Sequence, residues 1–211
     1  MPVRFTDEEF EKLKRILTIH EWGLKTVMTK LDIIQEDLKS FQDNWAIDHI
    51  RCRLKEPMSI AQKLENLKLE VTADNVEKYL RDIAGVRIIC PFAKDIYYLV
   101  NLIRNIPDIT VTQEKDYISE PKASGYRSYH IILEVPVFHS GKLENVAVEV
   151  QIRTDAMNFW ANLEHKAKYK YKEDIPKHLS DELIKIADRI AELDQRMFGI
   201  NELISLMNKE I

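Results

Sequence analysis

Apolar residues recur at alternating steps of three and four near both ends of the chain, which is the spacing of an amphipathic helix. Near the N-terminus, Thr6 and Glu9 have the spacing of a capping box, and the pattern behind them predicts a helix over 6–41. A second helix is predicted over 179–208. The apolar positions of the two patterns are Phe10, Leu13, Leu17, His20, Leu24, Val27, Leu31, Ile34 and Leu38, and Leu183, Ile186, Ile190, Leu193, Met197, Ile200, Ile204 and Met207. Each set forms a heptad-like stripe, which can pack within one chain or between copies of it.

Between these helices the pattern changes to the period of two that is typical of strands. In the stretch HIRCRLK, the two faces are formed by Ile50, Cys52 and Leu54 and by Arg51, Arg53 and Lys55. Further strands are predicted over 83–92, 108–113, 126–137 and 145–153, and helices over 57–69, 94–105 and 155–171. A loop is predicted over 114–125, and a hairpin at Gly141. This order predicts an α/β (α+β) fold, with a mixed central sheet of about five strands flanked by helices.

The strand over 145–153 has two chemically different faces. Its apolar face is formed by Val146, Val148, Val150 and Ile152, and its other face by Ala147, Glu149, Gln151 and Arg153. In an isolated strand the polar face would be a solvated surface. Helices are predicted on both sides of this strand, and a strand flanked in this way tends to have neither face in water. A glutamate on such a buried face needs a partner or a metal ion.

Other charged residues could meet Glu149 at one site. Asp82, which precedes the strand over 83–92, can cap a turn or can hold Mg²⁺ together with Glu149. Arg87 lies inside that strand, where an unpaired cation is costly unless it faces a cleft that binds phosphate. The residues that could converge with it on a polyphosphate are Arg53, Lys55, Ser59 and Lys63. The alternative is that these cations are ordinary surface charge.

The stretch EKDYISEPKASGYRSYH offers groups that could bind a second nucleotide. It contains Lys115 and Lys122, and Tyr126 and His130 share one face of the following strand. A tyrosine beside a glycine can stack on a nucleobase, whereas Tyr129 points the opposite way and is expected in the core. One stripe of the next helix carries Asn158, Ala161 and His165.

Composition narrows the function classes. The 211 residues are 45% hydrophobic and carry a net charge of −4, which fits one globular domain and argues against a general nucleic-acid binder. Cys52 and Cys90 both lie in apolar extended runs and are expected to be buried free thiols of a cytoplasmic protein. A zinc site would need more ligands at closer spacing. We expect no membrane span.

Three motifs, RDIAGVRIIC, KDYI…PKASGYRSYH and VEVQIRTDAMNFWANLEH, resemble the synthetase domain of the Rel/SpoT family in its stand-alone form, the small alarmone synthetases. The similarity runs from about Arg53 to Met197. It implies a nucleotidyltransferase-like fold that transfers pyrophosphate from ATP to the 3′-hydroxyl of GDP or GTP, forming ppGpp or pppGpp and AMP. We find no hydrolase region of the family in the sequence.

The resemblance also implies roles for individual residues. Asp82 and Glu149 would hold Mg²⁺, and Glu149 would also take the proton of the 3′-hydroxyl. The residues around ATP would be Arg53, Lys55, Ser59, Lys63 and Arg87. Those around GDP or GTP would be Lys115, Lys122, Tyr126, His130, Gln151, Asn158, Ala161 and His165, with the ring of Tyr126 on the guanine. Asn66 departs from the family pattern, because the family has at this position an arginine that packs on the adenine of ATP. Lys68 is the candidate to replace that arginine.

The organisation expected from these features is a single synthetase domain over 1–211, with a helical region over 6–41, a catalytic core over 48–172 and a C-terminal helix over 179–208. Members of the family are commonly homotetramers, so a homo-oligomer that uses the terminal helices is expected. Regulation by RNA stays open. Two alternatives remain: a catalytically silent nucleotide- or RNA-binding regulator, and a nucleotidyltransferase that adds AMP and releases pyrophosphate. Loss of the Glu149 charge is expected to leave the thermal midpoint unchanged or higher, because repulsion from Asp82 would fall.

Overall fold

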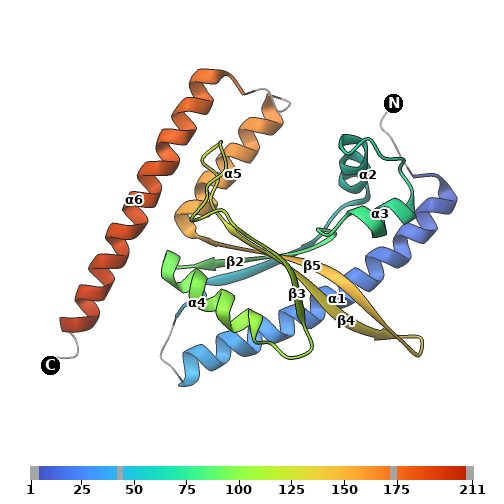
Figure 1. Ribbon diagram of the computed structural model, residues 1–211, viewed down its shortest axis with the longest axis horizontal. Coiled ribbons are helices and arrows are strands. Elements are labelled where there is room, and N and C mark those ends of the chain that lie inside the picture. The colour runs from blue at the N-terminus through green and yellow to red at the C-terminus, as the bar shows by residue number, and fades with distance from the viewer. Residues whose placement is uncertain (1–4, 42–44, 172–174, 208–211) are drawn as a thin grey trace.

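A five-stranded sheet forms the centre of the computed structural model, which describes residues 5–41, 45–171 and 175–207 (Figure 1). Its strands are β1 (His49–Leu54), β2 (Ala84–Cys90), β3 (Thr110–Asp116), β4 (Tyr129–His139) and β5 (Lys142–Thr154). Their order across the sheet is β1-β2-β5-β4-β3. β2 and β5 are parallel, and the other neighbouring pairs are antiparallel. The mixed sheet of five strands that the sequence predicts is therefore confirmed.

Two helices, α1 (Asp7–Phe41) and α4 (Ala93–Arg104), cover one face of the sheet. The apolar face of β5 packs there, as its alternation predicts, and Val148, Val150 and Ile152 are fully buried. Gly23 allows α1 to approach β5 closely, since a Cβ at this position would lie 2.3 Å from Val146 Cγ2. The apolar stripe of α1 is thus largely used within the chain.

The other face of the sheet is flanked on one side by α2 (Pro57–Asn66) and α3 (Ala73–Tyr79) (Figure 1). These two short helices share a second hydrophobic cluster with Leu13 and Ile16 of α1. We did not expect α3 from the sequence. Its signal was present, because Thr72 caps the helix by accepting a hydrogen bond from the backbone nitrogen of Asn75.

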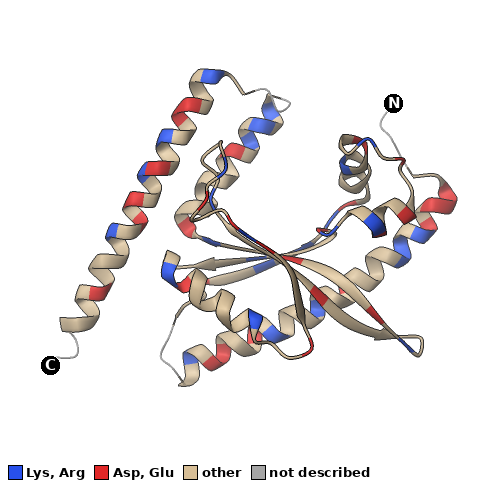
Figure 2. Cartoon of the chain, viewed as in Figure 1, with Lys and Arg blue, Asp and Glu red and all other residues tan. Residues whose placement is uncertain are grey.

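On the opposite side of this face lie α5 (Asp155–Lys170) and α6 (Lys177–Met207). Trp160 of α5 is buried and donates a hydrogen bond from its ring nitrogen to the carbonyl of Leu183, 2.8 Å away. The buried residues of α6 are Leu183 and Ala187. Most apolar side chains in its second half are exposed, and Figure 2 shows few charges there. The apolar stripe of α6 is therefore mostly uncovered within one chain.

Several boundaries differ from the sequence predictions. Residues 114–116 extend β3 instead of starting a loop, because they pair with β4. Tyr126 and Arg127 precede β4, and the helix that begins at Pro57 ends at Asn66. Residues 172 and 208, expected to end the core and the last helix, lie outside the described residues. The β4–β5 hairpin turns at Ser140 and Gly141, both with positive φ, as the glycine predicts.

The two cysteines are both free, but only one is buried as expected. Cys90 lies in the core, whereas Cys52 is exposed. The prediction for Cys52 is wrong because β1 is an edge strand, whose outer positions are not covered by a neighbouring strand. Among the described residues, no helix is long and apolar enough to cross a membrane.

Candidate active site

Polar side chains form rows across the uncovered face of the sheet, because paired residues in adjacent strands point to the same side. One row is Arg51, Arg87, Gln151, His130 and Lys115, one residue from each strand. The next row contains Arg53, Gly85 and Glu149. The sheet register therefore brings together residues that are far apart in the sequence.

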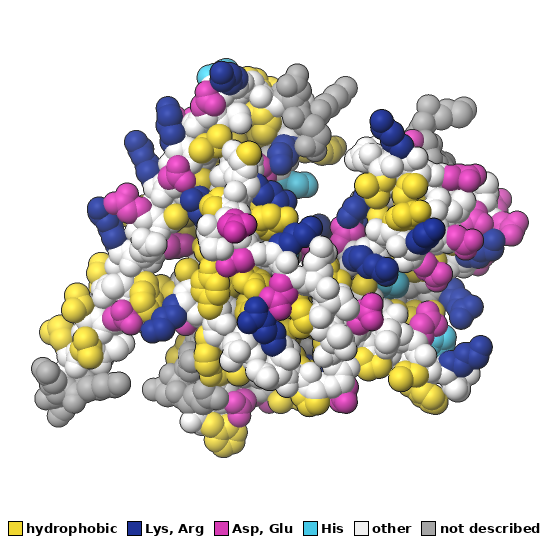
Figure 3. Space-filling model, in the orientation of Figure 1, with side chains coloured by type: hydrophobic (Ala, Val, Ile, Leu, Met, Phe, Trp, Pro, Cys, Tyr) yellow, Lys and Arg dark blue, Asp and Glu magenta, His cyan; other side chains and the backbone are white. Residues whose placement is uncertain are grey.

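A cavity of about 220 Å³ lies over these rows. It is lined by Arg51, Cys52, Arg53, Asp82, Gly85, Val86, Arg87, Glu149 and Gln151. In Figure 3 the molecule is hollowed between the α5–α6 part and the α2–α3 part, and Lys and Arg side chains surround the hollow. Five of the candidate residues from the sequence line this cavity: Arg53, Asp82, Arg87, Glu149 and Gln151. Both candidate metal carboxylates thus face one space.

Asp82, between α3 and β2, is held by two lysines. The ammonium groups of Lys55 and Lys63 each lie 2.6 Å from its Oδ2 atom. Burial raises the pKa of the Asp82 carboxyl, but the two ammonium groups lower it further, so this pKa lies below its ordinary value. The other oxygen, Oδ1, is buried and has no hydrogen-bond partner among the described residues. Asp82 is therefore ionised, and one of its oxygens is available to a ligand.

Glu149 of β5 has different partners. Its Oε1 atom lies 3.1 Å from Nδ1 of His130, and its Oε2 accepts a hydrogen bond of 3.0 Å from the amide of Gln151. Burial and the charge of Asp82 raise the pKa of Glu149, whereas His130 and Gln151 lower it, and the pKa lies below its ordinary value. The buried glutamate thus has the partners that its position in the sequence requires, and it is an ionised proton acceptor.

Asp82 and Glu149 fit a magnesium ion on the chemistry of their atoms. Mg²⁺ prefers carboxylate oxygens and usually keeps substrate phosphates among its ligands. The buried, unpartnered Oδ1 of Asp82 and the carboxylate of Glu149 line the same cavity. These two residues would hold the ion.

Arg87 of β2 is a cation placed between other cations. Burial and the neighbouring charges of Arg153 and Arg53 lower its pKa below the ordinary value. Its Nε atom is buried and has no hydrogen-bond partner among the described residues. A buried donor of this kind is costly to leave unpaired, so an anionic ligand in the cavity would stabilise it.

A cluster of rings lies next to Glu149, at the end of the loop over 117–128. The hydroxyl of Tyr126 lies 2.8 Å from Nε2 of His130, and the ring of Tyr117 packs edge-on against both. The ammonium of Lys122 lies 4.5 Å from the centre of the Tyr117 ring and 4.8 Å from that of Tyr126. Arg153 lies 5.0 Å from the centre of the Tyr126 ring. Tyr126, Lys122 and His130 therefore belong to one cluster, and their role in binding GDP or GTP stays a prediction.

The structure does not bring every candidate residue to the cavity lining. Ser59 lies on the exposed side of α2, and Ala161 is buried in the cluster between α5 and α6. His165 is exposed farther along α5. Asn158 lies on α5 with a buried Oδ1 atom that has no partner among the described residues. The roles of these residues in nucleotide binding stay predictions.

The end of α2, which carries Asn66, also lies away from the cavity lining. Asn66 and Lys68 are both exposed, and neither lines the cavity. Lys68 has a positive φ of 59° where the chain leaves α2. Replacement of the family's arginine by Lys68 thus stays a prediction.

Six residues belong to the site that the sequence does not single out as candidates: Arg51, Cys52, Gly85, Val86, Tyr117 and Arg153. Arg51 shares a strand face with Arg53, and Arg153 shares one with Glu149, so alternation was the available signal. Gly85 pairs with Glu149, and its missing side chain leaves room in front of that carboxylate. Register between strands cannot be read from one strand, so this relationship had no signal.

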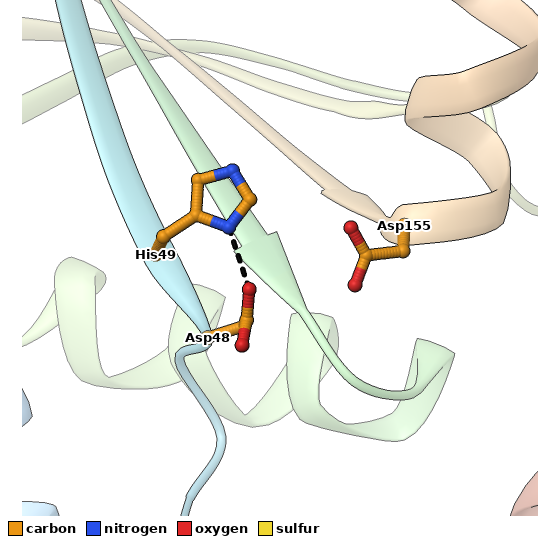
Figure 4. A group of neighbouring side chains, drawn as sticks. All are labelled: Asp48, His49 and Asp155. Atoms are coloured by element: carbon orange, nitrogen blue, oxygen red, sulfur yellow. Dashed lines mark hydrogen bonds and ion pairs between the residues drawn. The ribbon is translucent and has the colours of Figure 1, made fainter.

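A second group of metal-ligating side chains lies at the end of the sheet, outside the cavity lining. Asp48, His49 and Asp155 place one ligand atom each within 4.8 Å of one another (Figure 4). His49 Nδ1 already contacts Asp48 Oδ2 at 2.6 Å, and both aspartates are exposed. Their aspartate oxygens therefore differ from Oδ1 of Asp82, which is buried.

The chain is similar to known proteins over most of its length. A family model of the region found in RelA/SpoT proteins matches residues 52–174. The GTP pyrophosphokinase YwaC of Bacillus subtilis (strain 168) is 42% identical over 192 residues, which cover 91% of each chain. The GTP pyrophosphokinase YjbM of the same organism is 34% identical over 92% of this chain and 89% of the relative.

Solved structures show the same similarity. Small alarmone synthetase 1 from Bacillus subtilis, bound to its product pppGpp, matches with a TM-score of 0.85 and 33% identity over 92% of this chain and 98% of that chain. A GTP pyrophosphokinase family protein from Streptococcus pneumoniae matches with a TM-score of 0.85 and 31% identity over 98% and 99%. The family model covers more than half of the chain, and these relatives cover nearly all of it. The chain therefore belongs to the RelA/SpoT family, as its three motifs predict.

Proposed function

We propose that the protein is a GTP pyrophosphokinase, which transfers the β,γ-pyrophosphate of ATP to the 3′-hydroxyl of GDP or GTP. The bond between the β-phosphorus and its bridging oxygen to the α-phosphate breaks, a bond from the 3′-oxygen forms, and AMP leaves. The products are ppGpp or pppGpp. We expect the reaction in the cytoplasm, where these nucleotides are found.

The observation that supports this function best is the composition of one cavity. Two ionised carboxylates, Asp82 and Glu149, face the same space as Arg51, Arg53 and Arg87. In phosphoryl transfer the protein mainly positions the reactants and stabilises charge, so these groups are the required parts. A protein that only binds nucleotides needs the cations but not the two carboxylates.

On the donor side, we assign the triphosphate of ATP to the cations around Asp82. Lys55 and Lys63 bind Asp82 in the structure, and Arg53 and Arg87 lie beside it in the cavity lining. Mg²⁺ bound by Asp82 and Glu149 would neutralise phosphate charge. Arg87, whose Nε donor is free among the described residues, would bind a phosphate oxygen directly.

On the acceptor side, we assign the guanine to the face of the Tyr126 ring. The Lys122 ammonium lies over this ring, 4.8 Å from its centre, and Lys115 pairs with His130 across the strands, so both can neutralise acceptor phosphates. Glu149 is ionised and desolvated, and it can take the proton of the 3′-hydroxyl. A positioned general base contributes about 10²–10⁴-fold to rate.

The experiment that tests this function is product analysis of purified protein incubated with ATP, GDP or GTP and Mg²⁺. We expect AMP together with ppGpp or pppGpp on a thin-layer plate. A silent nucleotide- or RNA-binding regulator would form neither product. A nucleotidyltransferase that adds AMP would release pyrophosphate instead.

We also propose that the protein forms a homo-oligomer, with a tetramer as the expected state, through α6. The exposed apolar side chains in the second half of this helix are Leu193, Met197, Ile200, Leu203, Ile204, Leu206 and Met207. Their number suggests a contact surface, because soluble proteins rarely leave such a stripe uncovered. The matching stripe of α1 is mostly buried against the sheet, so we assign it no part in assembly.

A further inference from the structure

Five side chains of the candidate site form a closed ring of hydrogen bonds. Starting at Glu149, the ring passes to His130 (3.1 Å), to the hydroxyl of Tyr126 (2.8 Å), to Arg153, to Gln151 (2.9 Å) and back to Glu149 (3.0 Å). It joins the loop before β4 to strands β4 and β5. The proposed base and the proposed stacking ring are therefore parts of one connected unit.

The chemistry of Glu149 and Arg153 fixes the direction of their hydrogen bonds, and the position of the His130 proton sets the direction of the remaining one. An ionised carboxylate only accepts, so Nδ1 of His130 and the amide nitrogen of Gln151 must donate to Glu149. In the tautomer whose single proton is on Nδ1, Nε2 accepts, and the Tyr126 hydroxyl then donates there. Arg153 only donates, to the Tyr126 oxygen and to Oε1 of Gln151. Two donor chains thus start at Arg153, and each ends on one oxygen of Glu149.

Arg153 is a buried cation whose hydrogen-bond partners carry no charge. Its side chain is buried, with 4% exposure, and among the described residues no carboxylate forms an ion pair with it. Its partners are the neutral acceptors Tyr126, Gln151 and Ser128, the last through Nε at 3.2 Å. A buried cation without a carboxylate costs stability, so packing alone does not explain it.

We propose that Arg153 is a positioning residue, which orients Glu149 and Tyr126 together through the two donor chains. The proposal rests on the function proposed above, with Glu149 as base and Tyr126 under the guanine. The aromatic side chain of Tyr126 then stacks on the guanine of the acceptor, whereas its hydroxyl takes part in the closed ring of hydrogen bonds. A base held at both oxygens keeps its orientation toward the 3′-hydroxyl, and misplacement of about 1 Å can cost about 10²-fold in rate.

The two parts of Tyr126 can be separated by Tyr126→Phe, which keeps the aromatic face and removes the hydroxyl. We expect kcat for AMP formation to fall at least about 10-fold while KM for GDP changes by less than about 3-fold. Arg153→Met should lower kcat at least as much, and Arg153→Lys should recover part of that loss, because an ammonium can donate but lacks the guanidinium fork.

The opposite face of the sheet supplies matched controls. Arg104 donates to the hydroxyl of Tyr129 at 3.1 Å and to Glu114, so the chain contains a second arginine–tyrosine–carboxylate contact that faces away from the cavity. Arg104→Met and Tyr129→Phe should keep kcat within about 2-fold of the wild-type value. The proposal would be overturned if the two controls lost as much kcat as Tyr126→Phe and Arg153→Met. It would also be overturned if Tyr126→Phe and Arg153→Met both kept the wild-type kcat.

A readout without turnover covers the case in which Arg153→Met does not fold. The ring requires His130 to carry its proton on Nδ1, which ¹⁵N NMR of the histidine side chains detects, with a His130→Asn sample to assign the signal. The Nε2 shift of His130 should move in Tyr126→Phe and stay in Tyr129→Phe. A proton on Nε2, or a shift unmoved by Tyr126→Phe, would overturn the ring. Wild-type protein that releases no AMP would refute the proposed function instead, and the NMR result would still decide on the ring.

Discussion

Gly23 of α1 lies directly against Val146 of β5, and a Cβ added at position 23 would meet the Val146 Cγ2 atom at 2.3 Å. This distance is far below van der Waals contact. The glycine therefore sets how closely the longest helix packs on the sheet that carries the candidate site.

We predict that Gly23→Ala destabilises the protein by about 1–3 kcal/mol, because overpacking a well-packed core outweighs the better helix propensity of alanine. Gly199→Ala is the matched control, since nothing lies within 4 Å of a Cβ there. It should stabilise α6 by about 0.5–1 kcal/mol. Urea unfolding of both variants measures the two effects, and equal stability changes would contradict the close packing.

For the proposed base, we predict that Glu149→Gln keeps the fold and the binding of GDP or GTP but lowers the rate of AMP release at least about 10²-fold. The change keeps the size of the side chain and removes both its charge and its proton acceptor. Initial-rate measurement of AMP is the test. Near-normal turnover by the folded variant would refute the assigned mechanism.

The contacts of Glu149 change the expected stability of the same variant. Repulsion from Asp82 is present, but His130 and Gln151 stabilise the ionised form and hold the pKa of Glu149 below its ordinary value of 4.5. The charge therefore stabilises the fold above about pH 4.5, and this contribution is lost as the pH falls through the lowered folded-state pKa. Melting curves of Glu149→Gln should show a lower midpoint than wild type at pH 7 and a smaller difference below pH 4. A higher midpoint at pH 7 would show that repulsion dominates.

Removal of the Tyr126 ring should act on one substrate. We predict that Tyr126→Ala weakens binding of GDP or GTP by about 1–3 kcal/mol, the range for one base–aromatic stack, and changes ATP binding much less. Calorimetric titration with each nucleotide makes the comparison, with Tyr97→Ala, an exposed tyrosine of α4, as the control. Equal losses for both nucleotides would mean that Tyr126 supports the fold instead.

The two thiols should differ in reactivity. Cys52 is exposed, whereas burial raises the pKa of Cys90 far above its ordinary range. Thiolate is the reactive form, so native protein should show one fast-reacting thiol with a coloured disulfide reagent and two after denaturation. Cys52→Ser should remove the fast phase. Two fast thiols in native protein would contradict the burial of Cys90.

Assembly can be tested on the exposed stripe of α6. Light scattering at micromolar concentration should give a multiple of the 24.8 kDa chain mass. Ile200→Asp should reduce this mass, because a charge in an apolar contact surface opposes association. Ile33→Asp, at an exposed position of α1, should leave it unchanged. A monomer mass for the wild type would refute the proposal.

Alternation along single strands predicted much of the site. The parity of β5 placed Glu149 and Gln151 on one face, and the same rule placed Arg53 beside Lys55. The position of Asp82 at the start of β2 was likewise visible in the sequence. These relations are local, because a strand's side chains alternate whatever its neighbours are.

Relations between strands were not predictable in the same way. The pairing of Gly85 with Glu149, and the contact of Arg153 with Tyr126, depend on the sheet register, which one sequence does not give. Burial of Cys52 was predicted wrongly for a similar reason, since the position of β1 at the sheet edge follows from topology. α3 was missed because seven residues carry too little periodicity to stand out.

The two sides of the cavity to which we assign ATP and GDP or GTP are supported by separate hydrophobic clusters. α2, with Lys63, rests on α3 and on Leu13 of α1, whereas α5 and the loop before Tyr126 rest on α6 through Trp160 and Ala187. Substitutions distant from the site can therefore alter one substrate's binding without reaching the other's. Under these assignments, natural variation in one cluster would tune the preference for one nucleotide without altering the preference for the other, because only the sheet is common to both sides.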